Sequence, residues 1–271
     1  MFVSHLARPS IVALQPGVLL IRNTSLDSSG GGTVFASSKI ELDNATVIGG
    51  GFTIAVGGSL ITGAHGGTIS LGGGTVSNAG LIGGTAGGLT INGDVDNTGF
   101  VQALNGHLTI TGGLSGAGKA RVVGSGVLEV DGALGESAIF AVGATGALVL
   151  GDTAGFTGLV YRFSTTGANS IDLKDVAYNA ADTTSYSGTA AGGTLSILDG
   201  TTVIATVKLA GNYLRSTFNL SDGGANGTVI TDPTKTAALI SAMASFGATG
   251  SASSGLASHG TNPQTVLSLP H

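Results

Sequence analysis

The chain has 271 residues, of which 49 are glycine, and it contains no cysteine or tryptophan. Only 9% of its residues are charged, against about 25% in an average domain, yet 42% are hydrophobic, which excludes a charge-rich disordered chain. The formal net charge is −5 with ten Lys and Arg in total, so there is no basic stripe for phosphates, and no nucleic-acid partner is expected.

The N-terminal segment, residues 1–16, differs from the rest of the chain. It is apolar but interrupted by Pro9 and Pro16, and it lacks the basic start and continuous apolar run of a secretion signal. Either another signal directs export or, as we favour, the chain is a fragment of a longer protein. No run of about 18 apolar residues occurs, so no transmembrane segment is predicted. The lack of cysteine excludes a disulfide scaffold.

Residues 17–150 repeat a short pattern, in which two apolar residues alternate with other residues and a Gly or Asn comes next. The second apolar residue of the pattern recurs about every 20 residues. One interval, between Ile61 and Leu71, is only about 10 residues and represents either a half-turn or a corner insertion. The eight marker residues are Ile21, Leu42, Ile61, Leu71, Ile91, Ile110, Val130 and Leu150.

Within each unit, apolar and polar residues alternate, as from Leu108 to Thr111, so the apolar side chains share one face of a strand. The Gly or Asn after the strand tolerates a positive φ and forces a turn. A strand and a turn repeated at this period form one coil of a β-solenoid. The sequence therefore predicts an all-β fold, a right-handed parallel β-solenoid with coils of about 20 residues, in which Ile91 and Ile110 stack.

Beyond residue 150 the period is lost while strand patterns continue. Residues 151–232 carry hairpin turn residues, and we interpret them as a β-rich cap or small terminal β-domain, because the open end of a solenoid needs a cover. Asp232 and Pro233 form an N-cap and first helical position, and Leu239, Ile240, Met243 and Phe246 form an apolar stripe, which predicts one short helix over residues 233–247. Residues 248–271 are expected to form a flexible tail.

Two blocks of this sequence carry a resemblance to a known class. The first contains GGLTINGDVDNTGF and the second contains NSIDLKDVAY and YSGTAAGGTLSILDG. Together, over about residues 60–232, the chain resembles the C-terminal β-helical portion of large repetitive secreted or surface proteins of Gram-negative bacteria, of the autotransporter-like and adhesin-like kind. This resemblance implies a location outside the cell or on the bacterial surface. The chain departs from that class in having no C-terminal membrane barrel strands and no calcium-binding repeat array.

Candidate chemical groups lie at predicted corners. The acids Asp43, Asp94, Asp96, Asp131 and Asp152 stand beside Gly or Asn, where Asp normally bonds the local backbone. The run from Asn92 to Asn97, with Asp94 and Asp96, is the best cation candidate, and a second set is Asp172, Asp175 and Asp222. We favour turn roles for both, and the histidines have no metal-ligand spacing. No catalytic residue, cofactor or metal site is assigned.

The sequence thus favours a non-enzymatic extracellular protein with a structural and adhesive role. The alternatives are a carbohydrate-active β-helix enzyme and an ice-binding or polysaccharide-binding module. An array of outward threonines would support the binding module, and the candidates are Thr68, Thr75, Thr90 and Thr109. Expected partners are a surface or polysaccharide ligand and, through the solenoid ends, further copies of the chain in a homopolymer.

Overall fold

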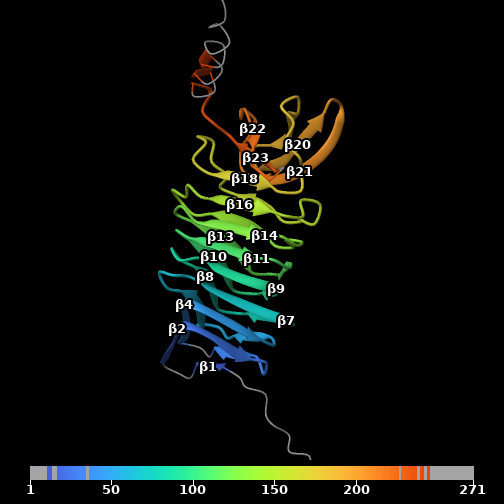
Figure 1. The fold of residues 1–271 in the computed structure, drawn as a ribbon. Coiled ribbons are helices and arrows are strands. Elements are labelled where there is room, and N and C mark those ends of the chain that lie inside the picture. The colour runs from blue at the N-terminus through green and yellow to red at the C-terminus, as the bar shows by residue number, and fades with distance from the viewer. Residues whose placement is uncertain are drawn as a thin grey trace, which may run out of the picture. The chain divides into compact units, whose positions relative to one another are not determined.

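The computed structural model describes residues 11–13, 17–34, 37–225, 227–236, 239–240 and 243–244. The chain divides into two units, Met1–Thr234 and Lys235–His271. The first unit is a parallel β-solenoid of about eight turns with coils of about 20 residues (Figure 1), as the sequence predicts. The strands of the coils form three faces, here named A, B and C, of which face C does not extend to the last coils.

Four long strands bend around a corner and serve two faces each. They are β2 (Gly17–Ser28), β4 (Ser38–Gly49), β7 (Gly67–Asn78) and β9 (Leu89–Asn97). Face A is formed by the first halves of β2 and β4, followed by β6 (Ser59–Thr62), β8 (Leu81–Gly84), β10 (Phe100–Leu104), β13 (Lys119–Val123), β15 (Ala138–Phe140) and β17 (Val160–Tyr161).

Face B and face C are built in the same way. Face B consists of the second halves of β2 and β4, the first halves of β7 and β9, and then β11 (His107–Ile110), β14 (Val127–Val130), β16 (Ala147–Leu150) and β18 (Ser170–Leu173). Face C consists of β1 (Ile11–Ala13), β3 (Gly32–Val34), β5 (Phe52–Ile54), the second halves of β7 and β9, and β12 (Leu114–Gly116).

The core is a set of in-register apolar rows inside the coil. On face B, Ile69, Ile91, Ile110 and Val130 occupy one row in successive coils, and each is fully buried. The predicted stacking of Ile91 on Ile110 is therefore confirmed. Burial of one such side chain contributes about 1.5–3 kcal/mol. The coils are held together because most inner positions repeat this contact with the coils on both sides.

The marker pattern of the sequence does not follow one face throughout. Leu42 pairs with Thr62, whereas Ile61 pairs with Glu41 and its side chain is half-buried on the outer side. Ile21 and Leu42 belong to face A, while the markers from Ile91 onward belong to face B. The short interval after Ile61 is thus a step from face A to face B within one coil, which is a partial turn and not a corner insertion. Periodicity alone misses this change because both faces show the same alternation.

Corners use Gly and Asn for two different reasons. Asn23 and Asn44 adopt φ of 51° and stack, with the Asn44 amide 2.9 Å from the Asn23 Oδ1 atom. Gly112 and Gly132 do not have positive φ, and a Cβ at either would lie within 2.7 Å of backbone in the preceding coil. At these two positions close approach, and not conformation, requires glycine.

The C-terminal end of the coil is covered by antiparallel hairpins. One set consists of β19 (Thr183–Thr189), β20 (Gly192–Asp199) and β21 (Thr202–Ala210), and the other of β22 (Asn219–Asp222) and β23 (Thr228–Thr231). The end of β21 continues face A beside β17, and β23 pairs antiparallel with β18 on face B. Parallel pairing thus continues beyond residue 150, to Leu173 on face B and to Ala210 on face A.

Packed aromatic rings fix the cap to the last coils. Phe163 contacts Phe140, Tyr213 and Phe218 at centroid distances of 6.2–6.4 Å, and Tyr186 packs against Tyr213 and Phe218. The Tyr213 hydroxyl donates a 2.8 Å hydrogen bond to the Phe163 carbonyl oxygen. These rings close the apolar core where the stack of coils ends.

Three parts of the sequence prediction lie wholly or partly outside the described residues. They are most of the segment 1–16, about half of the helix expected over 233–247, and the tail 248–271. No helix is among the elements of the described part. The described part accordingly contains no helix with the length and apolar character needed to cross a membrane.

The first prediction concerns the direction in which neighbouring side chains point. Ile91→Asp places an unpaired charge in the closed core, so we expect it to lower the free energy of unfolding by roughly 4 kcal/mol or more. Thr90→Asp, on the outside of the same strand, should cost less than about 1 kcal/mol. Urea denaturation of both variants tests this, and equal losses of stability would contradict the assigned facing.

The second prediction concerns self-association at the N-terminal end. Among the described strands, β2 pairs along its full length only with β4. Leu26 on β2 is 37% exposed, whereas Val47, its register partner on β4, is 1% exposed, so the apolar core is open at this end. The C-terminal end is covered, so association through β2 would join two chains and then stop, instead of forming an open fibre. Light scattering over a concentration series should show at most a dimer that Leu26→Lys weakens. Growth into filaments would contradict this expectation.

Candidate functional site

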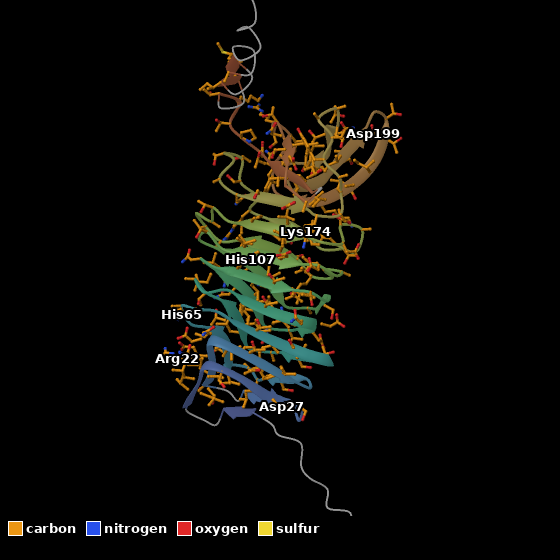
Figure 2. The ribbon with its side chains drawn as sticks, viewed as in Figure 1. Arg22, Asp27, His65, His107, Lys174 and Asp199 are labelled. Carbon is orange, nitrogen blue, oxygen red and sulfur yellow. The ribbon has the colours of Figure 1, made fainter. Side chains whose placement is uncertain are left out.

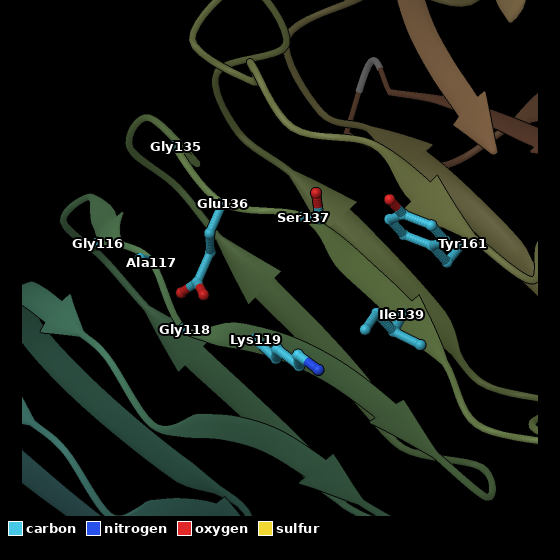
Figure 3. A pocket seen from close by; sticks show the side chains of 9 residues that line it. All are labelled: Gly116, Ala117, Gly118, Lys119, Gly135, Glu136, Ser137, Ile139 and Tyr161. Atoms are coloured by element: carbon cyan, nitrogen blue, oxygen red, sulfur yellow. The ribbon is translucent and has the colours of Figure 1, made fainter. Parts of the chain in front are cut away.

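A hollow of about 480 Å³ opens at the corner between faces C and A, in the coils of β13, β15 and β17 (Figure 3). Two glycine-containing corner loops form one wall, at Gly116–Gly118 and at Gly135. The side chains around it are Lys119, Glu136, Ser137, Ile139 and Tyr161. They come from three successive coils because parallel stacking places the same corner one strand spacing apart, about 4.8 Å.

Glu136 belongs to a polar ladder inside the coil. Asn78 pairs with Asn97 in the next coil, and Asn97 pairs with Gly116 in the coil after that. Gly116 has no side chain, and the Glu136 carboxylate lies beside the Gly116–Gly118 loop (Figure 3) and contacts Asn97. The Asn97 amide nitrogen lies 3.0 and 3.1 Å from the two Glu136 oxygens, and the Asn78 amide lies 2.7 Å from the Asn97 Oδ1 atom.

The environment of Glu136 favours its protonated form. The residue is only 4% exposed, and Asn97 is fully buried. Burial raises the pKa of Glu136 from 4.5 to about 7, and the hydrogen bond from Asn97 offsets only part of this effect. A carboxyl group with this pKa is able to exchange protons near neutral pH.

The hollow nevertheless lacks the groups for glycoside hydrolysis. That reaction uses two carboxyl groups on opposite sides of the scissile bond, separated by roughly 5–10 Å. Glu136 is the only acid among the described residues that line the hollow. Its carboxyl group is also turned toward Asn97, away from Tyr161 (Figure 3). The described lining of the hollow therefore supplies one carboxyl group and not the pair that this reaction uses.

The acids expected at corners are spread along the coil and mostly bond nearby backbone. The Asp94 carboxylate accepts the Gly113 N–H at 2.8 Å, and Asp152 accepts the Gly155 N–H at 2.9 Å. Asp96 is exposed on the outside of face C. Neither Asp94 nor Asp96 converges with a third acid, and no group of three or more metal-binding side chains occurs among the described residues.

Asp43 holds the corner between faces A and B. Its carboxylate accepts the His65 N–H at 3.0 Å and lies 2.9 Å from His65 Nδ1 and 2.7 Å from Arg22 Nε. The hydrogen bonds from His65, followed by the charge of Arg22, lower the pKa of Asp43. Figure 2 labels Arg22 and His65 on these N-terminal coils. The contacts join successive coils and so have a structural role.

The second candidate cation site, Asp172, Asp175 and Asp222, does not bring its three carboxylates together either. Asp175 accepts hydrogen bonds from the Thr153 N–H at 2.8 Å and the Thr153 hydroxyl at 2.5 Å, and Asp222 accepts the Gly224 N–H at 2.8 Å. Asp172 stands apart, with a buried Oδ1 atom that has no hydrogen-bond partner among the described residues. Burial, followed by the charge of Glu129, raises the pKa of Asp172.

Sequence reasoning missed a charged cluster on face B. Lys174 Nζ lies 2.6 Å from Asp131 and 2.5 Å from Glu129, and His107 Nε2 lies 2.8 Å from the second Glu129 oxygen (Figure 2). The hydrogen bonds to Asp131 and Glu129 raise the pKa of Lys174. Glu129 and Lys174 are 45 residues apart. Predicting this contact from the sequence would have required the correct register between the coils.

Three of the four expected outward threonines share one row. Thr68, Thr90 and Thr109 lie in register on the outside of face B, preceded in the row by Thr46. Thr75 lies on face C, in register with Asp94. The row ends at Glu129, so it covers four coils with one threonine in each. It borders a shallow hollow of about 320 Å³ between His65 and His107.

The third prediction derives from the raised pKa of Glu136. Protonation stabilises the fold, so this contribution is complete below pH 4.5 and is lost as the pH rises through about 7. Replacing Glu136 by Gln should remove this loss, which is on the order of 3 kcal/mol at most, and make the variant relatively more stable at pH 8.5. Urea unfolding from pH 4 to 8.5 measures the difference, and Asp96→Asn is the exposed control. Parallel curves for the wild type and Glu136→Gln would contradict the prediction.

Comparisons with known proteins give no family for this chain. No protein-family model matches it, and neither a curated protein nor a solved structure matches it. The β-solenoid is therefore established from the structure of the chain itself. The resemblance of residues 60–232 to autotransporter-like proteins, and any function, stay proposals.

Proposed function

We propose that this chain is a non-enzymatic structural and adhesive segment of a secreted or surface-displayed bacterial protein. The observation that carries the proposal is the continuous stack of about eight coils, which repeats outward side chains at one strand spacing. Such a stack offers an extended surface and needs no deep cavity. The resemblance to autotransporter-like proteins supports a location outside the cell.

The absence of a convergent acid pair in the described part favours binding over catalysis. The expected acids lie at different corners and bond backbone groups or basic side chains. The acid that differs most from the expected corner acids is Glu136, which is buried and lies beside a hollow. We therefore place the carbohydrate-active enzyme second, and no cofactor is required by the proposal.

The threonine row on face B favours a polysaccharide-binding or ice-binding module as another candidate. Its hydroxyl groups repeat at about 4.8 Å, which suits a regular surface. The row is only one residue wide and four coils long, and threonine is common on solvent-facing strands for its β propensity alone. The row thus adds to an adhesive surface without defining its ligand.

The fourth prediction tests adhesion and catalysis in one experiment. We expect the purified chain to be retained on insoluble polysaccharide or on bacterial cells, and to release no reducing ends or unsaturated sugars from polysaccharides. Thr90→Lys, on face B, tests whether the threonine row contributes to retention. Failure to be retained on any surface would contradict the adhesive role. Product release that stops in Glu136→Gln would instead establish the enzyme.

A further inference from the structure

The outside of face A carries a set of side chains unlike any other part of the described surface. Phe100 and Gln102 on β10 pair with Lys119 and Arg121 on β13. Arg121 then pairs with Ile139 on β15, and Ile139 pairs with Tyr161 on β17. We name these six residues, which occupy four successive coils, the face A strip.

The strip is positively charged although the chain is acidic overall. Lys119 and Arg121 have no acidic partner within 4 Å among the described residues, unlike Arg22, Lys39 and Lys174. Arg162, Lys208, Arg215 and Lys235 are likewise without such a partner, but Lys119 and Arg121 lie two residues apart on one strand and on the same face of it. Glu136, which lines the same hollow as Lys119, is buried and turned toward Asn97. A surface with two unpaired cations in a chain of formal charge −5 marks a place for an anionic group.

The strip also exposes aromatic rings, which are rare in this chain. Phe100 is 42% exposed and Tyr161 is 39% exposed, and they are the two aromatic residues among the exposed large hydrophobic side chains of the described part. The guanidinium carbon of Arg121 lies 5.5 Å from the centre of the Phe100 ring. This cation–π contact holds a flat apolar surface next to a charge. Exposing rings costs solvation free energy unless a partner covers them.

The hollow beside Glu136 lies within the strip. Lys119 and Tyr161 both line it, together with Ile139 and the Ser137 hydroxyl group, as Figure 3 shows. The strands of Phe100 and Tyr161 are three strand spacings apart, about 14 Å. The strip is therefore long enough for several sugar rings in line, and the hollow can receive one of them.

These features together match one class of ligand. The C–H face of a pyranose ring is apolar and packs on an aromatic ring, its hydroxyl groups accept and donate hydrogen bonds, and a uronate carboxylate pairs with Lys or Arg. We propose that the face A strip binds an acidic polysaccharide, with Tyr161 and Phe100 as stacking surfaces and Lys119 and Arg121 as the anion contacts. This inference rests on the proposed adhesive function and names its ligand class and its site.

The test uses the full chain with polygalacturonate as the probe, by biolayer interferometry. Neutral dextran controls for the sugar backbone and poly-aspartate controls for charge alone. We expect the Lys119→Gln, Arg121→Gln double variant to lose at least about tenfold in affinity and to show a weaker salt dependence, because two charged contacts are lost. Tyr161→Ala should lose severalfold in affinity with the salt dependence unchanged.

A matched variant separates the strip from general charge. Arg215→Gln removes a positive charge from an exposed side chain in the cap and should bind like the wild type. Circular dichroism melting of each variant verifies that it is folded. The proposal is overturned if polygalacturonate does not bind, if the double variant binds as well as the wild type, or if poly-aspartate binds equally tightly, which would indicate an acidic polypeptide.

The outcomes also distinguish this inference from the proposed function. Retention on polysaccharide that persists in the double variant but is lost in Thr90→Lys would leave the adhesive role intact and move its site to face B. Absence of retention on every surface, together with no binding of polygalacturonate, would remove both.

Discussion

In-register parallel stacking is the constraint on which the whole molecule depends. Each strand satisfies its backbone donors and acceptors with the coil before and the coil after, so a residue acquires its environment from positions about 20 residues away. Ile91 is buried because Ile69 and Ile110 occupy the same inner position. The constraint leaves no room for a Cβ at Gly112 or Gly132, and it brings Glu129 to Lys174 across 45 residues. Local sequence and nonlocal register therefore have to agree in every coil.

The same constraint explains why polar groups inside the coil differ so much from those outside. Outer side chains such as Thr90 face water, so a substitution there affects mainly the equivalent residues in the neighbouring coils. An inner polar group has only the coil above and the coil below. Asn97 meets this requirement with Asn78 on one side and Glu136 on the other, and the cost of keeping a charge there appears as the raised pKa of Glu136.

Much of the fold was predictable because alternation and turn residues are local signals. The solenoid, the coil length and the stacking of Ile91 on Ile110 all derive from them. The change of face at Ile61 was not predictable, since faces A and B carry the same alternation and differ only in register. The hollow at Glu136 was missed for a related reason. A lone Glu followed by Ser in a corner gives no local signal, and its burial depends on Gly116 in the neighbouring coil.

The Asn78–Asn97–Glu136 ladder has a consequence for how far these coils are interchangeable. A pure apolar solenoid would tolerate loss or duplication of one coil, because any inner Ile or Leu row would close again on the next. Here four consecutive coils carry Asn, Asn, Gly and Glu at the same inner position. Without the glycine coil, Glu136 would stand one rung from Asn97, in a space too short for its extended side chain. The order of these coils in the stack is therefore fixed. A recombination event that removed or duplicated one similar repeat would destabilise the fold at this ladder.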